Sequence, residues 1–266
     1  FGFNCLTEFF HIDDHTDLSI NPIAKIKLVK QPDLPLDRLF DSIEDRATNR
    51  GVYKSGEITP AQSNFIINSV VDYPVETVFS FGGAATLASM QKEIAKKAWA
   101  IECRSPSKMF ETYKYIRIGE SEINKYRDGI CINDPIMRFL AFSGLFNRDV
   151  APKSDDYSIK TQINQFNEKI DSTDNFLYVL TKQNDRLSQI KAGMAYARIQ
   201  LAATKAGLSM HPLSQALQEY DEQKEQYKNI HTIMAKNGQT IQMWCRIGEA
   251  DKAVKTPRRD MNSFIA

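Results

Sequence analysis

An excess of charge of one sign, clustered cysteines and long apolar runs are all missing from this sequence. Its 34 lysines and arginines nearly balance 33 aspartates and glutamates, which leaves a net charge of +1. No broad basic surface for nucleic acid is therefore expected. No apolar run approaches the ~18 residues of a membrane-spanning helix, and no signal-peptide pattern is present. We expect a cytoplasmic protein without nucleic-acid or membrane partners, or a periplasmic one if an export signal preceded Phe1.

Cysteine and histidine are too sparse to indicate a familiar catalytic or metal motif. The cysteines have no C-x-x-C spacing, which indicates separate thiols and neither zinc nor a disulfide framework; they are Cys5, Cys103, Cys131 and Cys245. No serine lies in a nucleophile-elbow pattern, and only 4 histidines are present to serve a triad. The polar loop with His11, Asp13, Asp14 and His15 has metal-ligand residue types, but we interpret it as solvated and predict no metal site.

The chain has 266 residues, of which 42% are hydrophobic, enough for one large domain or two intimately joined ones. Ile26 and Leu28 alternate with lysines, which predicts a half-exposed strand near the front. Further on, spacing predicts a helix over 36–45 and another opened by Pro60. The pattern from Val75 to Trp99 is also helix-like beyond a Gly-Gly pair.

The middle of the chain contains a basic and aromatic segment followed by a polar one. Residues 108–130 interleave tyrosines with lysines and arginines, a pattern that suits base stacking, but nearby glutamates and the low net charge favour a lid or packing element. Residues 133–147 resemble a short capped helix. The stretch 148–174 is polar and irregular, and we predict a mobile loop there, which would suit a hinge or cover.

The last third has the clearest local patterns. Residues 176–180 form a short apolar run typical of a buried central strand. Lys191 to Ala206 reads as a helix with a small-residue face that stops at Gly207, followed by a short loop and a new helix from Pro212 towards residue 236. Residues 241–247 alternate as a strand that leaves at Gly248. These elements predict an α+β or α/β layered fold.

Two arginines four residues apart form a candidate phosphate clamp. Arg46 and Arg50 flank Thr48 and Asn49, so guanidinium forks and small polar groups lie in one short segment. A charged helix end would give the same pattern, and the residues alone do not separate the two. The 207–212 turn likewise has two interpretations, a cofactor platform or a plain turn after a core helix.

Taken in order, these segments resemble the nitroreductase-like FMN-binding flavoproteins. The resemblance rests on four segments, namely Arg46 to Arg50, the helix and loop 192–215, Arg246-Ile247-Gly248 and Pro257-Arg258-Arg259. More narrowly, the chain resembles the fused Acg-type branch, in which two nitroreductase-like halves imitate a homodimer. The resemblance covers about residue 36 to the end as the second half, 31–266, with a lid-like insert at about 104–174. Residues 1–30 resemble the C-terminal remnant of a first half.

The resemblance implies an α+β fold with a mostly antiparallel sheet flanked by helices, and FMN at the junction of the halves. Arg46, Thr48 and Arg50 match an Arg-x-Ser/Thr-x-Arg/Lys element at the flavin phosphate and ribityl chain, and Arg258 and Arg259 match basic residues that complete the phosphate site. The 209–213 loop matches a segment whose N–H groups reach the flavin ring. The full set implied at the cofactor is Arg46, Thr48, Asn49, Arg50, Ser209, Met210, His211, Pro212, Leu213, Arg246, Gly248, Arg258 and Arg259.

One element of the fused branch has no counterpart here. Its flavin-lining Pro-Ser-x-x-Asn-x-Gln-Pro-Trp-like run is absent, so it lies upstream of Phe1 or has been lost. The implied function is an FMN-dependent oxidoreductase that passes electrons from NAD(P)H through the flavin to a nitro, quinone or similar acceptor, with no catalytic side chain. The alternatives are a flavin-sequestering protein with a closed lid and a partner subunit that binds no flavin. A homodimer or an internal pseudo-dimer is implied.

Overall fold

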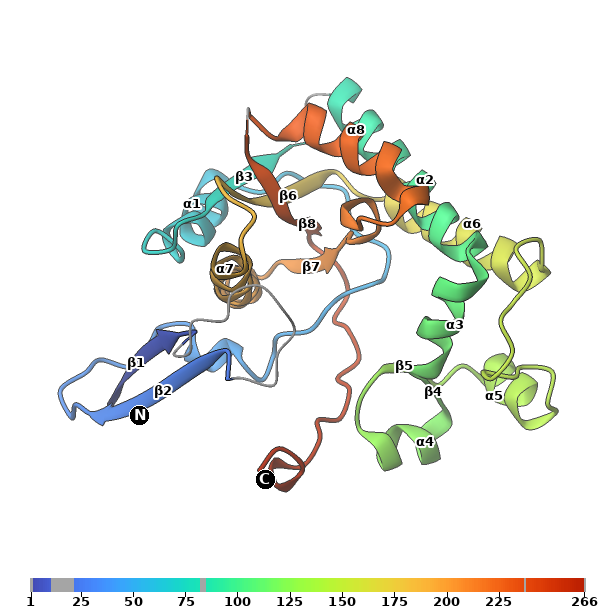
Figure 1. The fold of residues 1–266 in the computed structure, drawn as a ribbon, viewed down its shortest axis with the longest axis horizontal. Helices are drawn as coiled ribbons and strands as arrows, with labels where there is room; N and C mark the ends of the chain where they lie inside the picture. The colour runs from blue at the N-terminus through green and yellow to red at the C-terminus, as the bar shows by residue number, and fades with distance from the viewer. Residues whose placement is uncertain (1, 11–21, 82–84, 237, 266) are drawn as a thin grey trace.

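A four-stranded antiparallel sheet organises the molecule in the computed structural model, which describes residues 2–10, 22–81, 85–236 and 238–265 (Figure 1). The strands lie in the order β3-β6-β8-β7, and all neighbours are antiparallel. Their bounds are Glu76–Ser80 for β3, Asn175–Thr181 for β6, Thr240–Gly248 for β8 and Ser209–Pro212 for β7. β6 is buried throughout, as its unbroken apolar run predicts, because both of its faces are covered.

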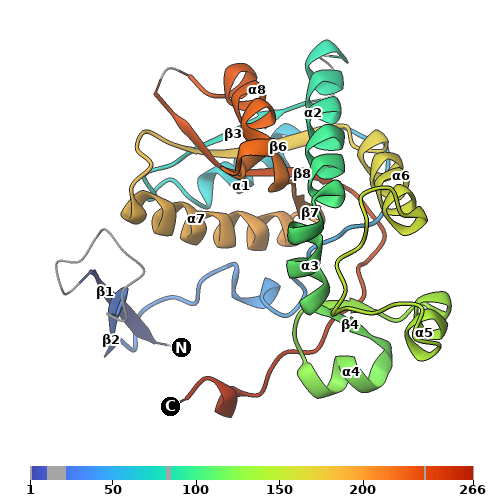
Figure 2. The same ribbon diagram turned by 45° about the vertical axis from the view of Figure 1, so that its right-hand side comes forward.

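Helices cover the two faces of this sheet. On one face lie α1 (Pro60–Asn68) and α7 (Arg186–Lys205), which pack on Leu177 and Val179 of β6. On the other lie α2 (Ala85–Arg104), α6 (Tyr157–Asp171) and α8 (Lys224–Met234), which pack on Phe176 and Tyr178. Figure 2 shows α7 running along the sheet with α2 and α8 on the opposite side. The predicted α+β architecture is confirmed.

The small-residue face of α7 packs directly on the sheet. Ala195, Ile199 and Ala202 are each 0% exposed and belong to the core on that face. The helix ends as predicted, because Gly207 takes φ +78° and Leu208 N–H bonds the Ala203 carbonyl at 2.8 Å, a glycine-based C-terminal cap. Small side chains let the helix lie close to β6 and β8.

Two smaller units lie beside the main layers. One contains α3 (Pro106–Lys114), β4 (Ile116–Ile118), α4 (Gly119–Tyr126), β5 (Ile130–Ile132) and α5 (Pro135–Phe142). It has its own apolar cluster around Met109 and Tyr113, and α5 lies within the capped helix predicted at 133–147, with Asp134 as its N-cap. The other is the hairpin of β1 (Phe3–Phe9) and β2 (Ala24–Lys30), whose strand at Ile26 and Leu28 is confirmed.

Three predictions about local structure are wrong. Residues 36–45 contain only the 3₁₀ turn Phe40–Ser42, because Leu39 is the one apolar residue buried there. The predicted mobile loop 148–174 contains α6, which packs Ile159, Ile163, Phe166 and Ile170 inward. The helix predicted beyond the Gly-Gly pair is confirmed as α2, and β3 precedes that pair. The segment from Pro212, predicted as one helix, consists of the end of β7, two 3₁₀ turns at Gln215–Leu217 and Asp221–Gln223, and then α8. Near the C-terminus, the chain has one more 3₁₀ turn at Met261–Ser263.

His231 joins α8 to β8 through both of its ring nitrogens. Nε2 accepts the Ile241 N–H at 3.0 Å, so Nδ1 carries the proton and donates to the Tyr227 carbonyl at 2.8 Å. Burial lowers the pKa of His231, although the bond to Tyr227 opposes the shift. The neutral form therefore belongs to the folded state.

Acid is expected to weaken this connection between α8 and β8. Because the folded pKa lies below the unfolded value of about 6.5, the stabilisation is complete above that pH and is lost as pH falls through the folded pKa. We expect His231→Gln to reduce the pH dependence of the free energy of unfolding between about pH 5 and 7, by at most about 1.4 kcal/mol per pH unit. Urea titrations at several pH values measure it, and an unchanged slope would contradict the assignment.

Candidate functional site

The predicted phosphate segment lies along the free edge of β7. Thr48 forms a parallel bridge with Met210, and the Asn49 N–H donates to the Met210 carbonyl at 3.0 Å. The Asn49 amide also donates to Ser209 Oγ at 3.1 Å and to the Asp251 carbonyl at 2.7 Å. An edge strand presents unpaired backbone groups, and this segment satisfies them. The structure thus brings the 48–50 and 209–211 segments together, although they are far apart in the chain.

Arg246 of β8 is buried at the centre of this arrangement, with 0% exposure. Its guanidinium donates to the Lys169 carbonyl and to the Gly51 carbonyl, each at 2.7 Å. It lies over the Tyr53 ring, 4.2 Å from the centroid. No carboxylate among the described residues pairs with it, and burial lowers its pKa. Arg246 therefore keeps an uncompensated positive charge while it ties three segments together.

His211 is neutral, and its Nε2–H is available as a hydrogen-bond donor. Arg246 Nε donates to His211 Nδ1 at 3.0 Å; since arginine stays protonated, Nδ1 must be the acceptor and Nε2 carries the proton. Burial holds the pKa of His211 well below its ordinary value, and the positive charges of Arg246, Arg50 and Lys169 lower it further. Within the described ranges the Nε2–H has no hydrogen-bond acceptor.

Arg50 and Lys169 complete a cationic cluster with His211 and Arg246. Burial lowers the pKa of Lys169, and the charges of Arg246 and Arg50 add to that shift while Glu168 opposes it. Neither the Arg50 guanidinium nor the Lys169 ammonium has a hydrogen bond or ion pair to another described residue. Like charges held together without a counter-charge are unfavourable, and such a cluster suits an anionic ligand. We call these four residues the cationic cluster.

The other predicted residues lie around or away from this cluster. Arg46 donates from Nη1 to Gln200 Oε1 of α7 at 3.0 Å, so its side chain faces that helix. Gly248 pairs with Ser209 in the sheet and lies against Tyr53, where a Cβ would come within 3.3 Å of the ring. Residues 209–213, predicted as a loop with free N–H groups, form the edge strand and its exit. The Leu213 N–H already donates to the Trp244 carbonyl at 2.7 Å, and proline at 212 has none.

Arg258 and Arg259 lie in a different place from the cationic cluster. They belong to the arm that leaves β8, and Arg259 forms an ion pair with Asp128 at 3.2 Å. Arg127, at the end of α4, donates to the Arg258 carbonyl at 2.7 Å. Figure 1 places α4 and the end of the arm at the opposite end of the molecule from β3, well below the sheet. Among the described residues no hydrogen bond or ion pair links them to residues 46–50.

Lys169 is the one member of the cluster that the sequence reasoning missed. It lies in the last turn of α6, within the stretch predicted to be a mobile loop. The spacing of Ile159, Ile163, Phe166 and Ile170, by four, three and four residues, was a usable helix signal. Recognition of that helix would have placed Lys169 at its end.

Metal and membrane sites are not apparent in the described part of the chain. No group of three His, Cys, Asp or Glu side chains there is arranged to hold a metal ion, and no described helix is both long and apolar enough for a membrane span. The candidate metal residues at 11, 13, 14 and 15 lie outside the described residues. The four cysteines are all described, and each is a free thiol.

Comparison of the fold with solved structures identifies its type. A nitroreductase with bound FMN from Bacteroides fragilis superposes with a TM-score of 0.50 at 12% identity, covering 86% of this chain and 98% of that one. One from Desulfitobacterium hafniense, also with FMN, gives 0.50 at 12%, covering 87% and 98%. The FMN-dependent nitroreductase NfnB from Mycobacterium smegmatis, in complex with NADPH, gives 0.50 at 12%, covering 85% and 96%. No family model and no curated protein matches the sequence. At this identity the likeness is one of architecture, and the chain has a nitroreductase-like fold.

Proposed function

We propose that this protein binds FMN and acts as an oxidoreductase that passes electrons from NAD(P)H to a nitro, quinone or similar acceptor. The observation that carries the proposal is the cationic cluster. The Arg50 guanidinium, the Lys169 ammonium and the His211 Nε2–H have no hydrogen-bond acceptor among the described residues. Two members of the cluster, Arg50 and His211, lie on the segments 48–50 and 209–211, which the resemblance places at FMN. Solved proteins of the same fold are described as FMN-bound, and one as NADPH-bound.

The donors of the cluster fit a phosphate monoester. Arg50 offers a guanidinium fork, Lys169 an ammonium and His211 an imidazole N–H, which together supply charge and directed hydrogen bonds to phosphate oxygens. Arg246 is a positioning residue, because its bond to Nδ1 keeps the His211 proton on Nε2. Arg46 and Thr48 flank this group and are proposed to contact the ribityl chain.

The hydride and electron chemistry would come from the bound flavin. The residues of this chain then have to bind and orient it, which agrees with the lack of a nucleophile or general base in the cluster. Burial of Arg246 removes competing water from the inner side of the site. The 104–174 insert is proposed to cover the site, with α6 supplying Lys169 from that insert.

Anaerobic reduction tests the proposed activity. The protein is reconstituted with FMN, freed of excess flavin and mixed with NADH or NADPH, while the flavin absorbance is followed. Loss of the yellow absorbance is expected. Flavin that binds but stays oxidised would indicate a sequestering protein, and protein that cannot be reconstituted would indicate a subunit without flavin; either result contradicts the proposal.

Two substitutions test the phosphate assignment. Arg50→Ala and Lys169→Ala should each weaken FMN binding by about 1.5–3 kcal/mol, the cost of a lost charged hydrogen bond. Quenching of flavin fluorescence measures the affinity. Lys228→Ala is the matched control, since Lys228 is an exposed lysine on α8, away from the cluster. Unchanged affinity in both test variants would remove the assignment.

We also propose that the β1–β2 hairpin is the end of a preceding nitroreductase-like half, as in the fused Acg-type branch. β1 and β2 pair only with each other within the described sheets. Leu6, Ile26 and Leu28 are 52%, 62% and 64% exposed, an apolar surface suited to burial against such a half. The preceding sequence should contain the flavin-lining run, and a preceding sequence of another type would contradict this.

A further inference from the structure

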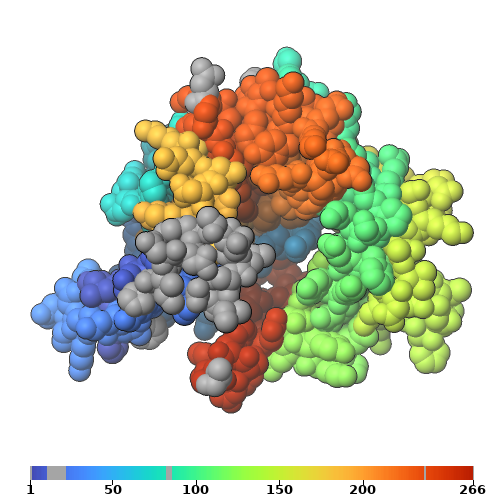
Figure 3. Space-filling view, viewed as in Figure 1, coloured from blue at the N-terminus to red at the C-terminus, as the bar shows by residue number. Residues whose placement is uncertain are grey.

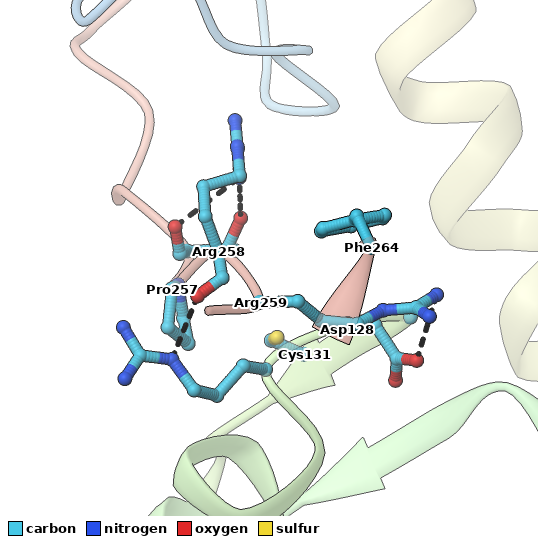
Figure 4. A pocket seen from close by; sticks show the side chains of 9 residues that line it. Asp128, Cys131, Pro257, Arg258, Arg259 and Phe264 are labelled. Carbon is cyan, nitrogen blue, oxygen red and sulfur yellow. Dashed lines mark hydrogen bonds and ion pairs between the residues drawn. The ribbon is translucent and has the colours of Figure 1, made fainter. Parts of the chain in front are cut away.

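A second group of arginines lines a cavity of about 220 Å³ between the turn after α4 and the C-terminal arm. Figure 3 shows the red arm meeting the green region that contains α4 and β4. Figure 4 shows Arg258, Arg259 and Phe264 of the arm around Asp128 and Cys131. Arg127 belongs to the same lining.

Each of the three arginines uses one guanidinium nitrogen for a bond within the protein, and its other guanidinium nitrogens have no described partner. Arg127 uses Nε on the Arg258 carbonyl. Arg258 uses Nη1 on the Thr256 carbonyl and hydroxyl, at 3.2 and 3.0 Å. Arg259 uses Nη2 on Asp128 and lies 5.6 Å from the Phe264 ring centroid. Six guanidinium nitrogens are thus left without a described partner, on side chains that are already oriented.

The charge of this cavity is positive. Asp128 is the one carboxylate in the lining, against three arginines. It is also shared, because Arg117 bonds the same carboxylate at 3.1 Å. One negative charge therefore faces four guanidinium groups, and the balance favours an anion. Guanidinium forks match the oxygens of phosphate better than any other small anion-binding side chain does.

We propose that this cavity is a second phosphate-binding site, separate from the cationic cluster, for a small phosphorylated ligand. At about 220 Å³ it lies below the range of about 300–1,000 Å³ that whole organic ligands occupy. It therefore takes a phosphate or pyrophosphate group and leaves any larger part of the ligand outside. The ligand crosslinks the arm to the α4–β5 unit, since Arg258 and Arg127 come from the two sides.

Binding of inorganic pyrophosphate to the full chain tests the site directly. Arg258→Ala and Arg127→Asn should each weaken it about tenfold or more, the equivalent of one charged hydrogen bond. Asparagine is chosen because Arg127 has φ +53°, which asparagine tolerates. Arg104→Ala, at the end of α2, is the control and should leave the affinity unchanged. Calorimetry that shows no binding, or equal binding by all variants, would overturn the proposal.

Cys131 provides an independent readout inside the cavity. Its thiol lines the site, so pyrophosphate should slow its alkylation by the uncharged reagent iodoacetamide several-fold. Cys5, an exposed thiol outside the cavity, serves as the internal control in the same mass-spectrometric measurement. Equal slowing at both cysteines, or none at Cys131, would count against a ligand in this cavity.

FMN distinguishes the two sources of phosphate. If the site is separate, saturating FMN leaves the pyrophosphate affinity unchanged, and Arg258→Ala leaves FMN binding unchanged. Competition between FMN and pyrophosphate that disappears in Arg258→Ala would mean that the arm binds the flavin phosphate, and it would overturn the separate site. The proposed flavin site at Arg50 is tested by its own variants. If that proposal fails, the pyrophosphate experiments still test the second phosphate site.

Discussion

Replacement of Arg246 by methionine is expected to lower the free energy of unfolding by about 2 kcal/mol or more. The side chain is 0% exposed, and its loss leaves the Gly51 carbonyl and the His211 Nδ1 without the Arg246 donor, whereas the Lys169 carbonyl keeps the Ser172 and Thr173 hydroxyls as donors. Each orphaned group costs about 1–3 kcal/mol. Urea denaturation followed by tryptophan fluorescence measures the change.

Arg198→Met is the matched control for that result. Arg198 also bonds a main-chain carbonyl, that of Ser69, and forms an ion pair with Asp37 at 2.7 Å. Its side chain is 31% exposed, so water replaces the lost partners and we expect about 1 kcal/mol or less. If both variants lose the same stability, burial is not what makes Arg246 important. In the folded Arg246→Met protein FMN binding should also weaken, since His211 loses its orienting donor.

Substitution of Gly129 by alanine should disrupt the turn that supports the second cavity. Gly129 has φ +75°, and a Cβ there would lie 2.2 Å from the Tyr115 carbonyl oxygen. That oxygen belongs to the backbone and also accepts the Ile130 N–H at 2.8 Å, so it cannot move without breaking the β4–β5 connection. We expect a cost of about 3 kcal/mol, the sum of the left-handed conformation and the forced shift.

Gly144→Ala separates these two contributions. Gly144 has the same φ of +75°, but nothing lies within 4 Å of its added Cβ. It should therefore cost only the conformational part, about 1–2 kcal/mol. Hydrogen exchange of residues 115–132 reports the local opening in each variant. An equal effect of the two substitutions would show that the contact with Tyr115 is relieved easily.

Elements with strong local signals were predictable from the sequence. The apolar run of β6, the small-faced helix α7 and its stop at Gly207 all depend on neighbouring residues, and each is confirmed. The same holds for α1 after Pro60 and for the capped helix α5. Segments whose structure depends on a distant partner were not predicted. Residues 209–212 look like a loop until β8 lies beside them, and only pairing makes them a strand.

Pairing also decided which face a side chain occupies. Ile241 and Met243 were expected on one face of their strand, but the register shifts between Val179 and Leu180 of the neighbouring β6. Ile241 consequently packs with the α2–α8 face, whereas Met243 packs with the α7 face. The extra residue is Gln242 of β8 itself, opposite the Val179–Leu180 step of β6, and the alternating sequence pattern does not mark it.

The candidate site divides in the same way. By itself, the sequence determined the residue types that can hold a phosphate, and the ordered resemblance pointed to Arg50 for the phosphate and to His211 and Arg246 elsewhere at the cofactor. Only the tertiary structure added Lys169 and placed Arg258 and Arg259 at a cavity away from the cationic cluster. The physical reason is that a cationic cluster is a property of distance and burial, because charges from α6, β7, β8 and a loop act on one another only once the sheet has brought them together.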